Sequence, residues 1–252
     1  LNILKLDTYP SLFRPLLSSW VLFKELITAP LIHHYVLAER CYNTELSFVK
    51  NKATVIENKA SVQCDSLPKK FKHKNQKITI IFSGTIAEST GIFHCINLAK
   101  NLHNLDHEIQ LKIVGFCSIK KVLEKVRKET EEHPYISLIG GEELVPHPVI
   151  IEEIKKADFG FIYYPTNMAN DMCIPTKVYE YIALSKPYLT SHFNSFKNIT
   201  DQFSSGILVD FDQPDYPEIL KSIQDYPGIK NKSKNPVLWE NESYKFKKII
   251  EH

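Results

Sequence analysis

From residue 77 onward, short apolar runs alternate with segments in which apolar residues recur every three or four positions. The runs are rich in β-branched and aromatic residues, which is typical of buried strands, and the segments between them predict helices. After Gly91, for example, Ile92, Ile96 and Ala99 fall on one side of a helix. We predict strands at residues 77–82, 109–114, 135–139, 159–163, 187–190 and 206–209, and helices at residues 92–102, 119–131, 149–156, 178–184, 196–203 and 218–224.

Strands that alternate with helices in this way predict an α/β fold. Its core is expected to be a doubly wound, Rossmann-like parallel sheet that is covered by helices on both faces. Ligands of such sheets bind beyond the carboxyl ends of the strands. The candidate binding residues therefore lie in the loops that follow the predicted strands.

The chain before residue 77 follows a different pattern and predicts a partial, mainly helical N-terminal segment. Residues 12–40 predict one long helical stretch or two helices divided at Pro30. Their apolar residues predict either a helix on a membrane surface or, as we favour, a face covered by protein. A short strand is expected at residues 53–57, and a terminal helix at residues 237–250.

These patterns divide the chain into four parts. Residues 1–66 are expected to be the tail of an incomplete N-terminal domain, because the chain opens without Met in a strand-like segment, residues 1–6. Residues 67–76, which are rich in Lys, predict a linker. Residues 77–226 are expected to form the Rossmann-like domain, and residues 227–252 a C-terminal segment with the terminal helix.

Composition and charge argue against several classes of protein. The chain has 252 residues and is 43% hydrophobic, which is enough for a packed core. Its 31 basic and 29 acidic residues leave a net charge of +2, which argues against binding nucleic acid through charge. Five cysteines without paired spacing indicate neither a disulfide framework nor a zinc site, so we expect a reducing compartment. Because no segment predicts a membrane span or a signal peptide, the expected location is the cytoplasm.

Residues 174–190 carry the strongest candidate site, at the start of a predicted helix. Pro175 suits the first turn, and Thr176 and Lys177 follow it among backbone N–H groups that have no partner within the helix. Such a terminus attracts phosphate. Glu180 lies one turn further on the same face, so a nucleoside diphosphate would place its phosphates near Lys177 and its ribose hydroxyls near Glu180. The alternative is a helix that merely carries Thr and Lys at its start and a solvated Glu.

Two further loops follow predicted strands. The first begins with Gly84 and Thr85 and is a candidate for the phosphate side of a site, although Gly84 alone would also permit a tight turn. The second begins with Gly140 and runs through Leu144 to His147, and its glycines allow a ligand base to approach the backbone. His147 is either a ligand-binding residue or a residue of the helix cap without a chemical role.

Asp210 and Asp212 form an Asp-x-Asp pattern, which binds a divalent cation in some sugar-transfer enzymes. No third ligand lies near them in the sequence, so a solvated turn is the preferred interpretation. We expect neither a metal nor a cofactor.

Five segments, taken in their order, are more specific than any single motif. They are SGTIAESTGI (83–92), LKIVGFC (111–117), ISLIGG with LVPH (136–147), ADFGFIYY (157–164) and IPTKVYEYIALSKPYLT (174–190). Together they resemble the C-terminal domain of retaining glycosyltransferases of the GT-B fold, with the family 4 enzymes of bacterial surface-polysaccharide synthesis as the nearest likeness. The resemblance covers residues 77 to about 224. Residues 38–58 resemble the end of the family's N-terminal domain, and the terminal helix with Trp239 resembles the one that crosses back to that domain.

The resemblance implies a role for each candidate residue. Glu180 would contact the ribose, and the helix start around Thr176 would face the diphosphate of a nucleotide sugar. Gly84 would lie near the phosphates, and the loop of residues 140–144 near the base. Lys177 and the helix terminus would stabilise the leaving group.

The chain departs from the family's pattern in the first loop and before the helix. Thr85 and Thr90 stand where the family often has Arg and Lys, and Met172 stands where the family has the first of two spaced glutamates. The phosphate charge would then be met by the lysine of the helix start and by backbone N–H groups. Residues 167–171, with Asn170 among them, would replace the missing glutamate in contacts with the donor sugar.

The sequence therefore predicts a glycosyltransferase that moves a sugar from a nucleotide-diphosphate sugar to a glycan or lipid-linked acceptor with retention, in polysaccharide biosynthesis. Lys177 and Glu180 are its candidate catalytic residues, while His33 and His34 are expected to line a helix. Peripheral association with the inner face of the membrane stays open. The alternatives are a non-catalytic nucleotide-sugar-binding module or degenerate paralogue and, from the fold alone, a sugar-nucleotide epimerase.

Overall fold

A computed structural model describes most of the chain. The described residues are 20, 23–24, 26–38, 47–61, 76–163, 174–192, 194–229 and 235–251, without the side chains of residues 194–196 and 235. The strand predicted at residues 1–6, the beginning of the helical stretch predicted at 12–40 and residues 67–75 of the predicted linker lie outside them.

The chain divides into two compact units. Unit 1 comprises Leu1–Glu57 and Ser243–His252, and unit 2 comprises Asn58–Glu242. The four-part domain division expected from the sequence stays a prediction, because most of its linker lies outside the described residues.

Unit 2 is built on a parallel sheet of six strands. The strands are β3 (Ile78–Thr85), β4 (Ile109–Phe116), β5 (Ile136–Gly141), β6 (Phe159–Ile162), β7 (Tyr188–Thr190) and β8 (Gly206–Leu208). Their order in the sheet is β5-β4-β3-β6-β7-β8, and each neighbouring pair is parallel. The α/β fold class and all six predicted strands are confirmed. Because the order reverses between β3 and β6, the crevice beyond their carboxyl ends is the expected place for a ligand.

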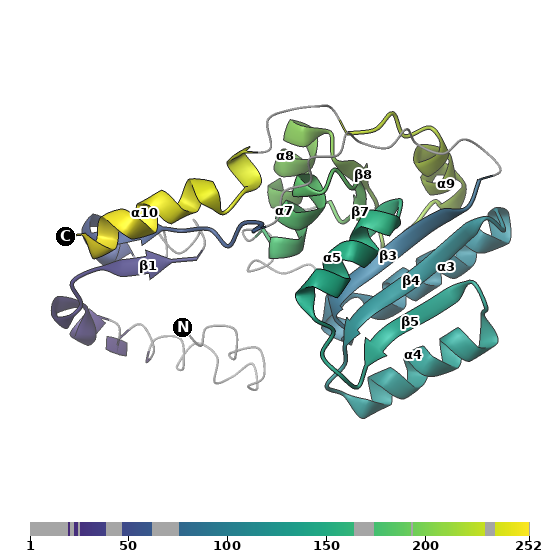
Figure 1. Ribbon diagram of the computed structural model, residues 1–252, viewed down its shortest axis with the longest axis horizontal. Helices are drawn as coiled ribbons and strands as arrows, with labels where there is room; N and C mark the ends of the chain where they lie inside the picture. The colour runs from purple at the N-terminus through teal and green to yellow at the C-terminus, as the bar shows by residue number, and fades with distance from the viewer. Residues whose placement is uncertain are drawn as a thin grey trace. The chain divides into compact units, whose positions relative to one another are not determined.

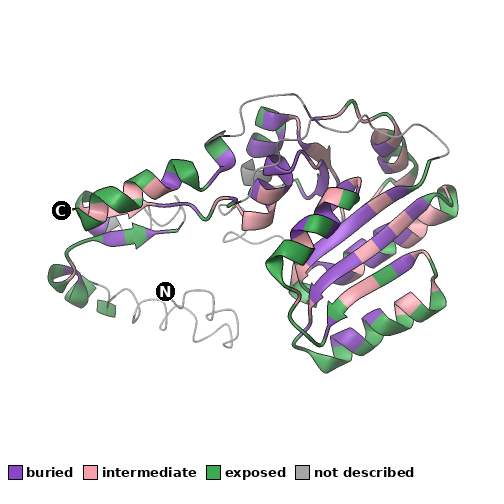
Figure 2. Cartoon of the chain, in the orientation of Figure 1, coloured by how far each residue is buried: buried purple, intermediate pink, exposed green. Residues whose placement is uncertain are grey.

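Helices cover both faces of this sheet (Figure 1). They are α3 (Ile92–Leu105), α4 (Lys120–Glu132), α5 (His147–Lys156), α7 (Thr176–Ala183), α8 (Asn194–Phe203) and α9 (Tyr216–Gln224), with 3₁₀ turns η4 (Glu88–Thr90) and η5 (Asn235–Val237). Along β3, Ile80 and Phe82 pack with α3, α4 and α9, while Ile81 packs on the opposite face with α5, α7 and α8. Figure 2 shows the strands β3 and β4 largely buried between these layers, whereas α4 is largely exposed.

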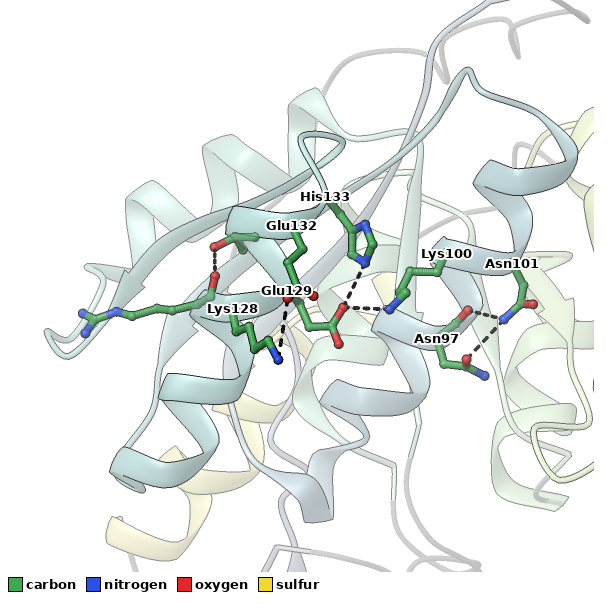
Figure 3. Close-up of polar contacts among 9 residues, drawn as sticks. Asn97, Lys100, Asn101, Lys128, Glu129, Glu132 and His133 are labelled. Carbon is green, nitrogen blue, oxygen red and sulfur yellow. Dashed lines mark hydrogen bonds and ion pairs between the residues drawn. The ribbon is translucent and has the colours of Figure 1, made fainter.

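Polar contacts join α3 and α4 on one of these faces (Figure 3). Nζ of Lys100 lies 2.9 Å from Oε2 of Glu129, and the same oxygen lies 3.4 Å from Nε2 of His133. Asn101 donates to the backbone oxygen of Asn97 one turn earlier. Partly exposed ion pairs contribute at most about 1 kcal/mol each, so apolar packing supplies most of the stability of this layer.

Unit 1 contains a small parallel sheet and the terminal helix. The strand β1 (Tyr35–Leu37) pairs with β2 (Ala53–Val55). Along the chain, the 3₁₀ turn η2 (Ala29–Leu31) precedes β1 and the 3₁₀ turn η3 (Ser47–Lys52) separates the two strands, while most of the helix α10 (Glu240–Ile250) belongs to this unit. The boundary between the two units falls within α10. Among the described residues of unit 1, a buried apolar cluster is formed by Ala29, Tyr35, Leu37 and Val49.

The structure corrects the sequence prediction in unit 1. Residues 35–37, expected to be helical, form β1, because β2 lies alongside and supplies parallel pairing. His33 and His34 therefore precede a strand and do not line a helix. The terminal helix begins at Glu240 and not at residue 237, after a 3₁₀ turn and a bridge at Leu238.

A short paired segment closes unit 2. Ala60 bridges in parallel to Leu238, with its N–H donating to the carbonyl of Val237 at 3.0 Å. Beside this bridge, Nζ of Lys59 lies 2.6 Å from Oε1 of Glu242, and the side chain of Glu242 is buried while that of Lys59 is mostly buried. The start and the end of unit 2 are thus held together by backbone hydrogen bonds and by an ion pair.

None of the described helices combines the length and the apolar character needed to cross a membrane.

Candidate functional site

Three glycines lie side by side at the carboxyl edge of the sheet. Gly84 of β3 pairs in register with Gly115 of β4, which pairs with Gly140 of β5. A Cβ atom at Gly115 would lie 1.7 Å from the backbone oxygen of Gly84, and one at Gly140 would lie 2.4 Å from the oxygen of Gly115. Since a side chain cannot fit at these two positions, this glycine row presents backbone to which a ligand can approach closely.

The helix α7 begins beside the end of β3. Pro175 is the N-cap of this helix and so precedes its first turn, whereas the sequence analysis had placed Pro175 within that turn. Its carbonyl accepts the N–H of Val178 at 2.9 Å. The backbone N–H groups of Thr176 and Lys177 belong to the first turn, where a helix offers donors and a positive dipole end to an anion.

Lys177 reaches from this first turn to the glycine row. Its Nζ donates to the carbonyl of Ser83 at 3.0 Å and lies 5.3 Å from the centre of the Phe82 ring. A Cβ at Gly84 would lie 3.9 Å from the same nitrogen. Burial lowers the pKa of Lys177 to about 8, although Glu180 acts in the opposite direction. The ligand-free site therefore holds a cation at a cost that a bound anion would offset.

Glu180 lies one turn further along α7 and meets His147. Oε1 of Glu180 lies 2.7 Å from Nε2 of His147, the first residue of α5. The carboxylate is mostly buried and the imidazole half-exposed. The structure thus brings together Gly84, Lys177, Glu180 and His147, which the sequence had singled out on three separate segments.

Two further contacts support α7 at this edge. Nδ2 of Asn58 donates to Oγ1 of Thr176 at 2.8 Å, although the two residues lie far apart in the sequence. The hydroxyl of Tyr181 lies 2.9 Å from Oγ of Ser83, and burial raises the pKa of this tyrosine. These contacts fix the helix start against β3, so the positions of the residues around Lys177 are set by the fold.

The other candidate residues occupy the loops. Thr85 is the exposed last residue of β3, and its carbonyl accepts the hydroxyl of Thr90 at 2.8 Å. Leu144 is 79% exposed in the loop beyond β5, so its side chain is accessible there. Asn170 and Met172 lie outside the described residues, as does the whole segment 164–173.

The Asp-x-Asp pattern forms a turn. Oδ1 of Asp210 accepts the N–H groups of Asp212 at 3.0 Å and of Gln213 at 3.1 Å. Among the described residues, no group of three or more His, Cys, Asp or Glu side chains is placed to hold a metal ion. The local hydrogen bonds are those of the solvated turn that we preferred from the sequence.

Unit 1 has a hollow of its own. It has a volume of about 630 Å³, and His34 on its wall bonds Thr54 through Nε2 at 2.9 Å. The hollow shares no residue with the glycine row. It is lined by His33, His34, Thr54, Tyr244, Lys245, Lys248 and Ile249.

Sequence reasoning missed two residues of the site. Gly115 lies at the end of a predicted strand, where an isolated glycine indicates that another backbone or a ligand approaches closely. The sequence therefore held a signal from which this residue could have been predicted. Asn58 carried no such signal, because its contact with Thr176 depends on how the chain folds between them.

The comparisons with known proteins concern the fold. No family model and no curated protein matches the sequence. Among solved structures, the pneumococcal O-GlcNAc transferase GtfA in complex with UDP and GlcNAc is similar with a TM-score of 0.60 and 13% identity, over 90% of this chain and 46% of that one. HepE from Anabaena, in complex with UDP and glucose, is similar with a TM-score of 0.60 and 10% identity, over 87% of this chain and 63% of that one.

Unit 2 has the fold of one Rossmann-like half of a GT-B glycosyltransferase. A third structure with this fold is AviGT4, a glycosyltransferase of avilamycin A biosynthesis, with a TM-score of 0.56 and 12% identity, over 84% of this chain and 61% of that one. The chain thus spans between about half and two thirds of the length of these glycosyltransferases.

Proposed function

We propose that unit 2 binds a nucleotide-diphosphate sugar and that the chain is the donor-side part of a glycosyltransferase. The observation that carries this proposal is the convergence of the glycine row, Lys177 and the Glu180–His147 pair where the strand order reverses. Ligands of doubly wound sheets bind at this place. The proteins of similar fold whose structures contain UDP support a nucleotide as the first ligand to test.

In this proposal each group meets one part of the donor. The diphosphate would lie over Gly84 and take hydrogen bonds from the first-turn N–H groups around Thr176, with Lys177 as its cation. Glu180 would accept hydrogen bonds from the ribose hydroxyls, and the loop of residues 140–144 would lie beside the base. Stabilisation of the departing diphosphate by Lys177 and the helix terminus would be the main contribution to catalysis.

The finer parts of the proposal concern the reaction. We infer transfer with retention, without a metal or cofactor, to a glycan or lipid-linked acceptor in polysaccharide biosynthesis. Asn170 would contact the donor sugar in place of the glutamate that Met172 replaces. The protein would work in the cytoplasm, with peripheral association at the inner face of the membrane where the acceptor is a lipid.

A second candidate is a non-catalytic module that binds nucleotide sugars. It is favoured by the first loop, where no lysine or arginine occurs between Gly84 and Gly91 and the hydroxyl of Thr90 bonds the loop's own backbone. Sugar transfer measured on a chain extended to the length of its structural neighbours separates the two candidates. Donor binding without transfer in that longer chain would favour the module.

The donor site itself is tested by calorimetric titration with UDP, GDP and their common sugar conjugates. We expect saturable binding of one of them, weakened by about 1 to 3 kcal/mol in Glu180→Ala, because that variant loses hydrogen bonds to a charged group. The matched control is Glu152→Ala, which removes an exposed carboxylate of α5 that pairs with Lys155. Unchanged affinity in a folded Glu180→Ala variant would remove Glu180 from the site.

A further inference from the structure

The contact between His147 and Glu180 joins two separate parts of the candidate site. The residues lie 33 positions apart, and Nε2 of the imidazole lies 2.7 Å from Oε1 of the carboxylate. The side chain of Glu180 is 14% exposed and that of His147 is 49% exposed. A largely buried carboxylate thus meets a hydrogen-bonding group that comes from the loop beyond β5.

The backbone on both sides of His147 is constrained. Pro146 precedes it and Pro148 follows it, and each ring fixes one φ angle near about −65°. Just upstream, a Cβ at Gly140 would lie 2.4 Å from Cγ2 of Val145, which shows how closely this loop packs on the end of the sheet. The backbone that carries the imidazole therefore loses less conformational entropy when the contact forms than an unrestricted loop would.

We propose that His147 is a positioning residue that orients the carboxylate of Glu180 and thereby makes the site select ribose over 2′-deoxyribose. This inference rests on the proposed function, in which Glu180 accepts the ribose hydroxyls. An imidazole N–H that donates to Oε1 fixes the rotation of the carboxylate and leaves Oε2 free to accept. A deoxyribose would leave part of an oriented, buried carboxylate without a hydrogen bond, and such a mismatch is costly.

The same contact adjusts the charge beside the diphosphate. Glu180 lies close enough to Lys177 to raise the pKa of that lysine, so its negative charge also acts on any phosphate that Lys177 holds. A hydrogen bond from His147 disperses part of this charge. The imidazole therefore serves both the orientation of the carboxylate and its compatibility with an anionic ligand.

The test compares UDP with 2′-deoxy-UDP, titrated calorimetrically into the full chain. We expect the wild-type protein to bind UDP at least about tenfold more tightly than the deoxy compound, as expected for one hydrogen bond to a charged group. In His147→Ala the preference should fall below about threefold, mainly through weaker binding of UDP. In His147→Gln, whose amide nitrogen reaches a similar position and can donate, most of the preference should return.

The outcomes separate a positioning role from a structural one. A residue that only supports the loop would weaken both nucleotides equally in the alanine variant, and this result would overturn the inference while leaving the donor site in place. An unchanged preference in His147→Ala would also overturn it. If the folded wild-type protein binds neither nucleotide nor their GDP counterparts, the proposed function itself fails and the inference fails with it.

Discussion

At the scale of single residues, the burial of the charged Lys177 amine costs free energy, and a bound anion would offset this cost. Burial lowers its pKa from 10.5 to about 8. Between pH 8 and 10.5 the unfolded chain therefore binds more protons at this lysine than the native protein does. The contribution of Lys177 to the free energy of unfolding therefore rises with pH across this window, since stability increases wherever the unfolded state binds more protons.

We predict that Lys177→Met makes the ligand-free protein more stable at pH 7. The lowered pKa corresponds to a destabilisation of the native protein by about 3 kcal/mol, which the substitution removes. The variant also loses the stabilising hydrogen bond to Ser83, worth about 1 kcal/mol, so we expect a net gain in stability of roughly 2 kcal/mol. The gain should shrink as the pH rises from 8 towards 10. Urea unfolding of both proteins at several pH values measures it.

The comparison between variants isolates the lysine from other titrating groups. Burial also raises the pKa of the Cys95 thiol, and this acts in the opposite direction above pH 9, but Cys95 is present in both proteins. Lys197→Met, which removes an exposed lysine paired with Asp201, should show no such dependence. A Lys177→Met protein less stable than wild type at pH 7 would contradict the prediction.

Individual site residues differ in how far the sequence could predict them. Lys177 and Glu180 lie within one turn of a helix, so helical spacing alone places them on one side. The contact of Glu180 with His147 depends on the crossover between β5 and β6, which local spacing does not contain. The contact could therefore be identified only once the fold was known.

At the scale of elements, periodicity predicted the helices and strands of unit 2 to within a few residues. Its strands lie in a sheet covered on both faces, where continuous apolar runs give a strong signal. The prediction failed at β1, which is three residues long and has the exposed Val36 between two buried neighbours. So short a segment acquires its conformation from the neighbouring strand β2, and its own sequence holds too little information.

The paired segment that closes unit 2 offers a prediction at this scale. In Glu242→Ala, the mostly buried amine of Lys59 loses this carboxylate, and we expect a cost of about 3 kcal/mol, the lower end for breaking a buried pair. Chemical denaturation followed by circular dichroism measures the loss. The double variant Lys59→Met with Glu242→Leu should recover much of it, because no buried charge is left behind.

The exposed ion pair of Lys197 and Asp201 provides the comparison for this experiment. Both of its side chains are more than half exposed, so Asp201→Ala should cost less than about 1 kcal/mol. Equal losses in Glu242→Ala and Asp201→Ala would show that burial of the first pair has no energetic consequence, against the prediction.

At the scale of the whole molecule, the chain consists of two units with separate cores. The described part of unit 1 holds a buried cluster of four residues, whereas unit 2 has two extensive cores, one on each face of its sheet. The alternation of strands and helices predicted the sheet of unit 2 and with it the two cores of that unit, since right-handed crossovers leave few ways to build a parallel sheet. The small core of unit 1 joins residues from β1 and both flanking 3₁₀ turns, and the sequence pattern did not contain it.

This division predicts that a nucleotide stabilises one unit alone. A ligand at about 100 times its Kd adds about 2.7 kcal/mol, which for a unit of this size raises Tm by about 5 to 10 °C. The two tryptophans report on different units, Trp20 on unit 1 and Trp239 on unit 2. In Trp20→Phe the fluorescence transition should therefore shift with UDP, whereas in Trp239→Phe it should not. Glu180→Ala should reduce the shift, and equal shifts in both tryptophan variants would show that the two units unfold as one.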